Sequence, residues 1–162
     1  MLRILIIISF LAFYQYNSSA QVRPVAFEDL KVLQARESRP VMILIMTSWC
    51  KYCLSMKNAM LRNKEISGIL SERFYVILLN AEERRNIIYG GGIFQFKPSG
   101  VNTGAHELAE QLGTINGQLT FPSICFLNEK DEIIYQHQGF LEPLTMALIS
   151  KSLMGPGANS IK

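Results

Sequence analysis

Two uninterrupted apolar runs, Val41–Met46 and residues 74–79, limit most strongly what this chain of 162 residues can fold into. Both runs are short and consist mainly of Val, Ile, Leu and Met or aromatic residues. A strand that is buried on both faces has this continuous pattern, whereas a half-exposed strand alternates apolar and polar residues. Because such a strand needs cover on both sides of its sheet, the runs predict an α/β domain.

The segments around these runs supply helices and a second pair of strands. The expected helices are residues 27–37, a segment from near Cys50 past Met60, a segment that starts at Asn63, residues 105–112 and residues 143–153. Residues 121–127 and 132–138, joined by a turn at 128–131, predict an antiparallel pair. This order of elements predicts a central mixed β-sheet with helices on both faces.

Turn-forming residues interrupt the pattern in the middle of the chain. Residues 90–92 are three consecutive glycines, and Pro98 and Gly100 follow. Glycine and proline end regular elements, so this part of the chain is expected to form a flexible loop or a short hairpin. We predict one domain over residues 21–154, with an insertion at about 84–104 and a flexible tail at 155–162.

The first twenty residues have the layout of a secretory signal peptide. One positive charge, Arg3, precedes an apolar run at 4–13, and the small residues Ser18 and Ala20 end the segment. The apolar run is shorter than the roughly 20 residues that a membrane-spanning helix needs. We therefore expect cleavage after Ala20 and export, into the periplasm of a bacterium; an uncleaved membrane anchor is the alternative.

The remaining chain, residues 21–162, carries little net charge. Without Arg3, the 16 Lys and Arg become 15, against 13 Asp and Glu, which gives a balance of +2. Such a small excess favours neither nucleic acid nor an anionic membrane surface as a partner. We expect a monomer whose partners are other proteins, with no membrane span after cleavage.

A Cys-x-x-Cys pair, Cys50 and Cys53, directly follows the first apolar run and opens a helix that Thr47 or Ser48 is expected to cap. The N-terminus of a helix has unpaired N–H groups and partial positive charge, and both favour a thiolate at Cys50, as does Lys51. Cys53, one turn further, would resolve a mixed disulfide on Cys50. Half of a zinc site is the alternative, but the sequence has no second Cys-x-x-Cys pair.

Over residues 40–153 the sequence resembles the thioredoxin superfamily, and most closely its exported bacterial thiol-disulfide oxidoreductases. The matching segments are residues 46–53 (Met-Thr-Ser-Trp-Cys-Lys-Tyr-Cys), Tyr75–Asn80, residues 121–127 and Gly139. The resemblance implies a thioredoxin-like fold and dithiol-disulfide exchange between the Cys50/Cys53 pair and protein substrates. The pair itself would be the reactive group, with no added cofactor and no metal.

The resemblance also implies where a substrate binds. In the superfamily the proline that opens the third core strand is cis and lies against the two cysteines, and the residue before it pairs through its backbone with the bound peptide. Pro122 matches that proline, which makes Phe121 the substrate-facing neighbour; an ordinary trans proline at a strand start is the alternative. Trp49, Lys51 and Tyr52 are the expected substrate contacts beside the cysteines.

The sequence departs from the superfamily pattern in two ways. Thioredoxins typically carry a buried acid six residues before the first cysteine and a lysine on the neighbouring strand, where this chain has Leu44 and Leu78. The joint loss fits the high cost of a lone buried charge. The dipeptide between the cysteines is Lys51-Tyr52 in place of Gly-Pro, so we expect a different reduction potential.

Two other functions stay open on the sequence alone. Cys50 and Cys53 could bind copper(I) or zinc together with His137, on the same fold. Alternatively, the pair could be a vestige in a noncatalytic interaction module. The two remaining candidates are weaker: Cys125 has the spacing of a buried core residue, and His106 is expected on a helix in contact with solvent.

Overall fold

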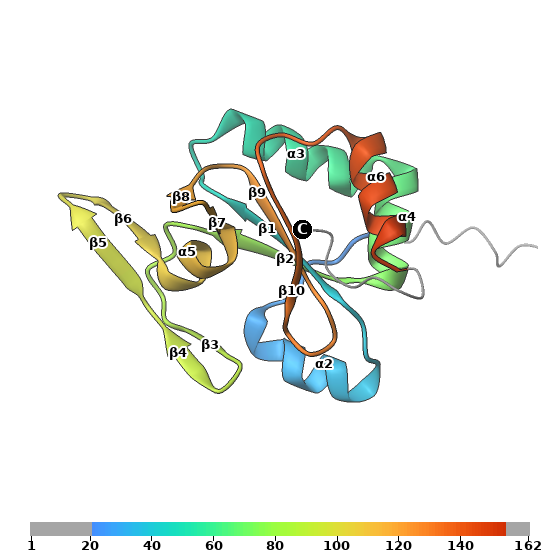
Figure 1. Cartoon of the computed structure of the whole chain (residues 1–162), viewed down its shortest axis with the longest axis horizontal. Helices are drawn as coiled ribbons and strands as arrows, with labels where there is room; N and C mark the ends of the chain where they lie inside the picture. Colours follow the sequence, from blue (N-terminus) through green and yellow to red (C-terminus); the bar gives the residue numbers. More distant parts are fainter. Residues whose placement is uncertain (1–20, 155–162) are drawn as a thin grey trace, which may run out of the picture.

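The centre of the computed structural model, which describes residues 21–154, is a four-stranded sheet (Figure 1). The strand order is β10-β9-β1-β2, and the strands span Ile133–Gln138, Ser123–Leu127, Val41–Met46 and Tyr75–Asn80. β1 and β2 are parallel, whereas β9 runs antiparallel to both β1 and β10. The predicted mixed sheet is confirmed, and β1 has a hydrogen-bonded partner on each side.

Helices α3, α4 and α6 cover one face of the sheet. They span Lys51–Arg62, Lys64–Arg73 and Pro143–Ser152. Met56 and Met60 of α3 are fully buried in the same apolar cluster as Leu44 of β1. The helix that begins beside the cysteine pair is therefore held on the sheet by side chains one and two turns further along.

The other face is covered by α5, Glu107–Gly113, and by the segment before β1. The helix expected at 27–37 is shorter: a 3-10 turn, η1 (Phe27–Asp29), leads into α2 (Leu30–Arg36). Phe27 and Leu30 pack into the core, whereas Val32 is 56% exposed. Val32 lies two residues, or about 200° around the helix, from Leu30, so it points away from the sheet.

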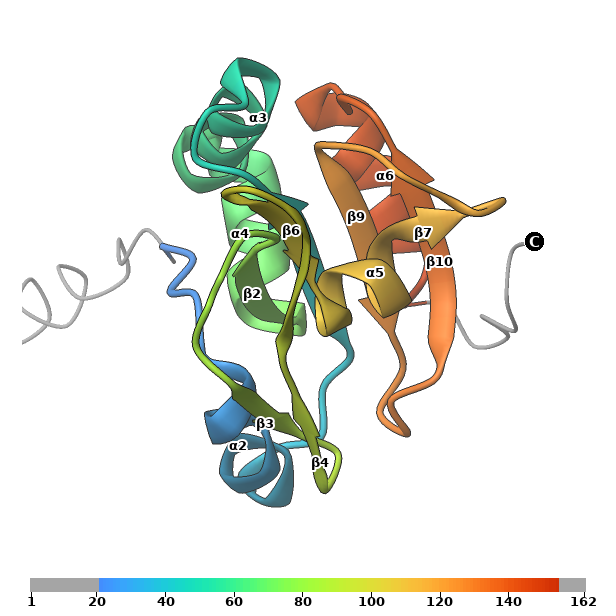
Figure 2. The same ribbon diagram turned by 90° about the vertical axis from the view of Figure 1, so that its left-hand side faces the viewer.

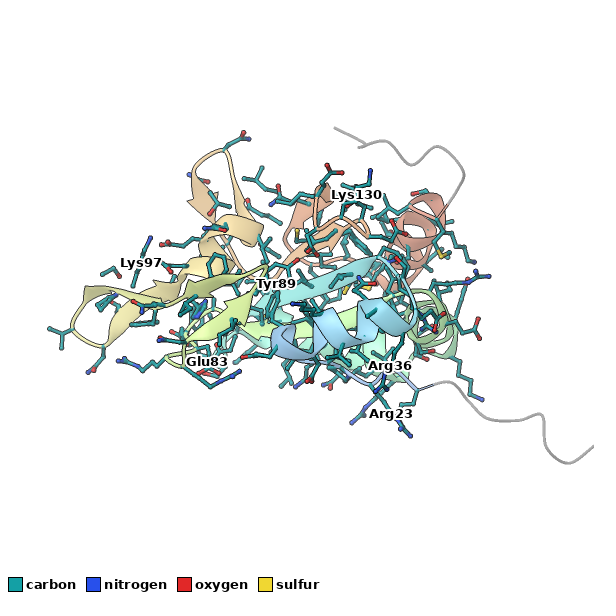
Figure 3. All side chains as sticks on the ribbon, turned by 90° about the horizontal axis from the view of Figure 1, so that it is seen from below. Arg23, Arg36, Glu83, Tyr89, Lys97 and Lys130 are labelled. Atoms are coloured by element: carbon teal, nitrogen blue, oxygen red, sulfur yellow. A yellow bond between two sulfur atoms is a disulfide. The ribbon has the colours of Figure 1, made fainter. Side chains whose placement is uncertain are left out.

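The insertion forms two ordered hairpins rather than a flexible loop. In the first, β3 (Ile87–Tyr89) pairs with β4 (Gly92–Phe94). Gly90 and Gly91 both have positive φ and make the tight turn between these strands, which explains the run of glycines. Tyr89 is directed toward the body of the domain, where its ring packs on Phe27 and its hydroxyl donates to Asp131 at 2.6 Å (Figure 3).

The second inserted hairpin joins β5 (Phe96–Gly100) to β6 (Thr103–His106). It extends the expected insertion at 84–104 by two residues, so α5 begins at Glu107 and not at residue 105. A further small hairpin, β7 (Thr114–Ile115) with β8 (Gln118–Leu119), precedes β9. Its strands are too short to leave a periodic pattern in the sequence.

Two sequence expectations about the ends of the chain fall outside the described residues. These are the signal peptide at 1–20 and the tail at 155–162. Between residues 21 and 154, no helix is both long enough and apolar enough to cross a membrane.

Candidate active site

Cys50 and Cys53 lie where the central strand β1 passes into α3, and they form a disulfide with their Cα atoms 5.2 Å apart. Cys50 is 8% exposed, whereas Cys53 is fully buried. Cys50 also caps α3, because its Sγ accepts a hydrogen bond from the backbone N–H of Cys53 at 3.1 Å. The helix terminus therefore acts directly on the sulfur of Cys50.

The expected cap by Thr47 or Ser48 is wrong. The chain between Met46 and Cys50 makes a turn, and the first helical hydrogen bond runs from the N–H of Leu54 to the carbonyl oxygen of Cys50 at 3.1 Å. Thr47 is buried, and within residues 21–154 its hydroxyl has no hydrogen-bond partner. A sulfur atom thus takes the position that a serine or threonine oxygen usually occupies.

Large exposed side chains surround the disulfide. Trp49 is 67% exposed and Tyr52 is 71% exposed, and Lys51 also reaches solvent. The indole of Trp49 meets the ring of Phe121 edge to face, with the ring centroids 6.3 Å apart. Apolar and aromatic surface of this kind is enriched at sites where proteins bind one another.

The segment before β9 brings Phe121 and Pro122 beside the cysteine loop, and the peptide bond between them is cis. β9 begins at Ser123, two residues later than the sequence pattern indicates. Two hydrogen bonds hold this bend. Ser123 Oγ donates to the carbonyl oxygen of Thr120 at 2.5 Å, and the N–H of Gly139 donates to the carbonyl oxygen of Pro122 at 2.8 Å.

Phe140, which the sequence did not single out, directly follows the residue that bonds to Pro122. The hydrogen bond from Gly139 to Pro122 sets the start of the β10–α6 connection against the cis peptide, and Phe140 follows with 36% of its surface exposed. Its signal in the sequence is its position directly after Gly139, one of the residues on which the family resemblance rests.

Glu82 is a second residue that the sequence did not single out. Its carboxylate oxygen Oε1 accepts a hydrogen bond from Nε1 of Trp49 at 3.0 Å. The side chain of Asn80, at the end of β2, accepts from the backbone N–H of Glu82 at 3.1 Å and fixes this turn. Because β1 and β2 are parallel, their carboxyl ends meet at one edge of the sheet, which brings Glu82 to Trp49.

Leu44 and Leu78, which stand where thioredoxins carry an acid and a lysine, are direct partners in the β1–β2 register. Leu44 is fully buried in the core under α3, and Leu78 packs against the same cluster. The side chains at these two positions therefore offer no group that could take a proton from Cys53. Proton transfer to and from Cys53 must use water or another group.

Cys125 lies on the opposite face of the sheet from α3, in the cluster formed with α2 and α5. It is fully buried, and burial raises the pKa of its thiol to about 12. The interpretation of Cys125 as a core residue thus fits the structure, and at neutral pH its thiol stays protonated.

The two histidines lie apart from the disulfide. His106 is fully buried, which corrects the expectation that it faces solvent: it ends β6, and its Nδ1 accepts from the backbone N–H of Leu108 at 3.2 Å. His137 is a half-buried residue of β10 that pairs with Ile124. Among the described residues, no three His, Cys, Asp or Glu side chains gather at one point, so His137 does not join the cysteines as a third metal ligand.

Solved structures of similar fold include a thioredoxin-fold protein, an oxidoreductase and a disulphide isomerase. A thioredoxin-fold protein from Helicobacter pylori aligns with a TM-score of 0.57 and 12% identity, over 89% of this chain and 81% of that protein. A DsbH oxidoreductase aligns with a TM-score of 0.55 and 15% identity, over 91% and 92% of the two chains. A disulphide isomerase from Xylella fastidiosa Temecula1 aligns with a TM-score of 0.53 and 13% identity, over 88% and 96%.

At these identities the structural likeness establishes the fold alone. No curated protein shows significant sequence similarity to the chain. The family model of the thioredoxin-like domain, however, matches residues 26–151, which is most of the sequence. Together with the mixed sheet and the disulfide at the start of α3, this match shows that the chain belongs to the thioredoxin-like family.

Proposed function

We propose that the chain is an exported protein thiol-disulfide oxidoreductase that works through Cys50 and Cys53. One observation carries the proposal: the two sulfurs form a disulfide at a helix N-terminus, where Cys50 keeps 8% of its surface exposed and Cys53 is fully buried. This arrangement makes the two cysteines unequal, because only Cys50 can meet a second protein. Unequal cysteines are what a reaction through a mixed disulfide requires.

The reaction conserves sulfur atoms and electrons in two steps. The Cys50 thiolate attacks a substrate disulfide, forms a mixed disulfide and releases one substrate thiolate, which takes a proton. Cys53 then loses its proton and attacks Cys50 Sγ, which frees the second substrate sulfur and closes the Cys50–Cys53 disulfide. Two electrons pass to the substrate, and the reverse sequence oxidises a substrate dithiol.

Substrate polypeptides would bind to the surface around the disulfide. Trp49, Tyr52 and Phe140 supply exposed apolar area, and Phe121 and Pro122 supply the backbone with which an extended peptide can pair. Lys51 contributes positive charge beside Cys50. Since β9 begins only at Ser123, the backbone groups of Phe121 are not used inside the sheet.

The proposal of export rests on the sequence and not on the structure. Residues 1–20 have the order of charge, apolar run and small residues found in secretory signal peptides, and Gln21 would become the first residue of the exported protein. An exported dithiol protein works where disulfides form and persist, in the bacterial periplasm or an equivalent compartment.

Cys50 should be the nucleophile of the reduced protein. After reduction, iodoacetamide at about pH 6 should label Cys50 well before Cys125, because the helix terminus stabilises the Cys50 thiolate whereas burial raises the pKa of Cys125 to about 12. Labelling of Cys125 should become appreciable only in strongly alkaline solution. Peptide mapping by mass spectrometry measures both rates, and equal labelling of the two cysteines at about pH 6 would refute the assignment.

Removal of the resolving thiol should trap substrates. Cys53→Ser should accumulate mixed disulfides with exported proteins, since nothing remains to attack the bond between Cys50 and the substrate. Cys50→Ser should accumulate far fewer, and Cys125→Ala in the Cys53→Ser background should leave the yield unchanged. The adducts are counted on non-reducing gels of an exported-protein fraction. Similar yields from Cys53→Ser and Cys50→Ser would show that the order of attack is wrong.

Lys51 should make the couple more oxidising. A cation beside Cys50 stabilises the thiolate and hence the reduced form, so Lys51→Gln should shift the reduction potential to a more negative value. An exposed charge stabilises a neighbouring opposite charge by about 0.3–1 kcal/mol, and this corresponds to a shift of roughly 6–20 mV in the reduction potential of a two-electron couple. Lys57→Gln, further along α3, is the control and should shift the potential less. An unchanged or less negative potential in Lys51→Gln at low salt would contradict this role.

A further inference from the structure

A small pocket is formed by residues that follow β2 and residues of the β5–β6 hairpin. This hairpin extends from the side of the molecule where β1 ends and α3 begins (Figures 1 and 2). Its volume is about 190 Å³. It is lined by Glu82, Arg84, Phe96, Asn102 and Gly104. Glu82 is the residue that holds Trp49, so the pocket begins one side chain away from the residue before Cys50.

The hairpin wall of the pocket is fixed to the domain. At its base, the N–H of His106 donates to the carbonyl oxygen of Ala81 at 2.7 Å, directly beside Glu82. The carboxylate of Glu107 accepts from the N–H of Gln95 at 2.8 Å and lies 3.2 Å from Nζ of Lys97, which Figure 3 shows on the outer part of the molecule. These contacts hold β5 in position relative to the cysteine loop.

Arg84 brings an unused positive charge to this pocket. Its guanidinium carbon lies 4.8 Å from the centroid of the Phe96 ring, a cation–π contact that orients the flat face of the group. Phe96 in turn packs closely over Gly104, where an added Cβ would lie 2.5 Å from the ring. Within residues 21–154, no carboxylate lies within ion-pair distance of Arg84. The edge of its guanidinium, which carries the N–H donors, is free for a ligand.

Glu82 is less available than Arg84, although both line the pocket. One of its carboxylate oxygens already accepts the indole N–H of Trp49, and its backbone is fixed by Asn80. An arginine held on an aromatic ring and without an acidic partner is suited to bidentate binding of a carboxylate. Glu82, like Arg84, has no ion-pair partner within residues 21–154, but its Oε1 is already bound to Trp49, so the guanidinium of Arg84 is the charged group of the pocket with the most free hydrogen-bonding capacity.

We propose that this pocket is a specificity site that binds an Asp or Glu side chain of the substrate polypeptide, with Arg84 as the residue that recognises the carboxylate. The inference rests on the proposed oxidoreductase function and names a substrate feature. Glu82 links the pocket to Trp49, the residue directly before Cys50. The acidic residue should therefore lie close in the sequence to the reacting cysteine.

The test compares disulfide-containing peptides that differ only in one residue near the reacting cysteine: Glu, Gln or Lys. The wild-type protein should reduce the Glu peptide with a kcat/KM roughly threefold to tenfold above that of the Gln peptide, the size expected for one charge-assisted contact that water partly screens. Arg84→Gln should abolish this preference and leave turnover of the Gln peptide unchanged. High salt should weaken the preference in the wild type.

Arg85→Gln is a matched control, because it removes the same charge at the next position along the chain. The Arg85 side chain pairs with Glu28 at 2.7 Å and does not line the pocket. This variant should keep the preference for the Glu peptide. An equal loss in Arg85→Gln would assign the effect to overall charge, and a preference for the Lys peptide would assign the pocket to Glu82. Equal turnover of all three peptides by the wild type would show that the pocket does not select substrates. Each of these three results overturns the proposal.

A binding measurement separates this inference from the proposed function. The oxidised protein is titrated with peptides whose cysteines are replaced by serine, and the fluorescence of Trp49, the one tryptophan in the sequence, reports binding. Tighter binding of the Glu peptide than of the Gln peptide, lost in Arg84→Gln, supports the pocket even if no peptide is turned over. Equal binding of the two peptides contradicts the pocket even if both are reduced.

Discussion

The burial of β1 between two partner strands and two helical layers is the constraint on which the site depends. Five of its six residues are fully buried, and β2 and β9 bond to its two edges. The carboxyl end of β1 is therefore fixed, and the turn after it places Cys50 at the N-cap of α3, directly before Lys51. Met56 and Met60 hold α3 on the sheet, so the helix terminus that stabilises a thiolate is rigid as well.

The same edge of the sheet collects the other parts of the site. β2 ends beside β1 and places Glu82 against Trp49. β9 starts at this edge and β10 ends there, and the hydrogen bond from Gly139 to Pro122 joins their ends. In an open sheet that contains parallel strands, binding groups gather at the carboxyl ends of those strands because the loops there converge. The position of the Cys50–Cys53 disulfide and the surface around it follow from that geometry.

Much of this could be predicted from the sequence where periodicity carries the signal. The continuous apolar runs indicate β1 and β2, and the polar residue Asn63 indicates the start of α4, where its Oδ1 accepts from the N–H groups of Glu65 and Ile66. Cys-x-x-Cys after a buried strand indicates the redox pair. In each case the residues that form the feature are close together in the sequence, so their pattern indicates the local structure directly.

The features that could not be predicted depend on contacts between distant segments. Glu82 has no local signal, since its role comes from a partner 33 residues earlier. The glycine run at 90–92 signals a turn, but it does not show that Tyr89 and Asp131 hold the hairpin in place. Cys50 replaces the expected cap because its sulfur, and not the Thr47 hydroxyl, faces the helix N-terminus, which only the path of the turn decides.

The loss of the buried acid and lysine separates this chain from typical thioredoxins more than the inserted hairpins do. Leu44 and Leu78 complete an apolar core under the disulfide and remove the side-chain proton acceptor for Cys53. Dithiol-disulfide exchange is still open to the chain, because the thiolate at Cys50 depends on the helix terminus and not on that pair. The inserted β5–β6 hairpin adds surface beside the disulfide without disturbing the sheet.

We propose that Cys50 and Cys53 form one reversible two-electron couple that exchanges with external thiols. The most direct measurement equilibrates the purified protein in glutathione or dithiothreitol buffers of graded potential and determines the state of each cysteine by mass spectrometry after acid quenching. We expect a single two-electron transition of Cys50 and Cys53, at a potential between about −270 and −120 mV, while Cys125 stays a free thiol. A disulfide that does not equilibrate with the buffers, or a transition that includes Cys125, would contradict it.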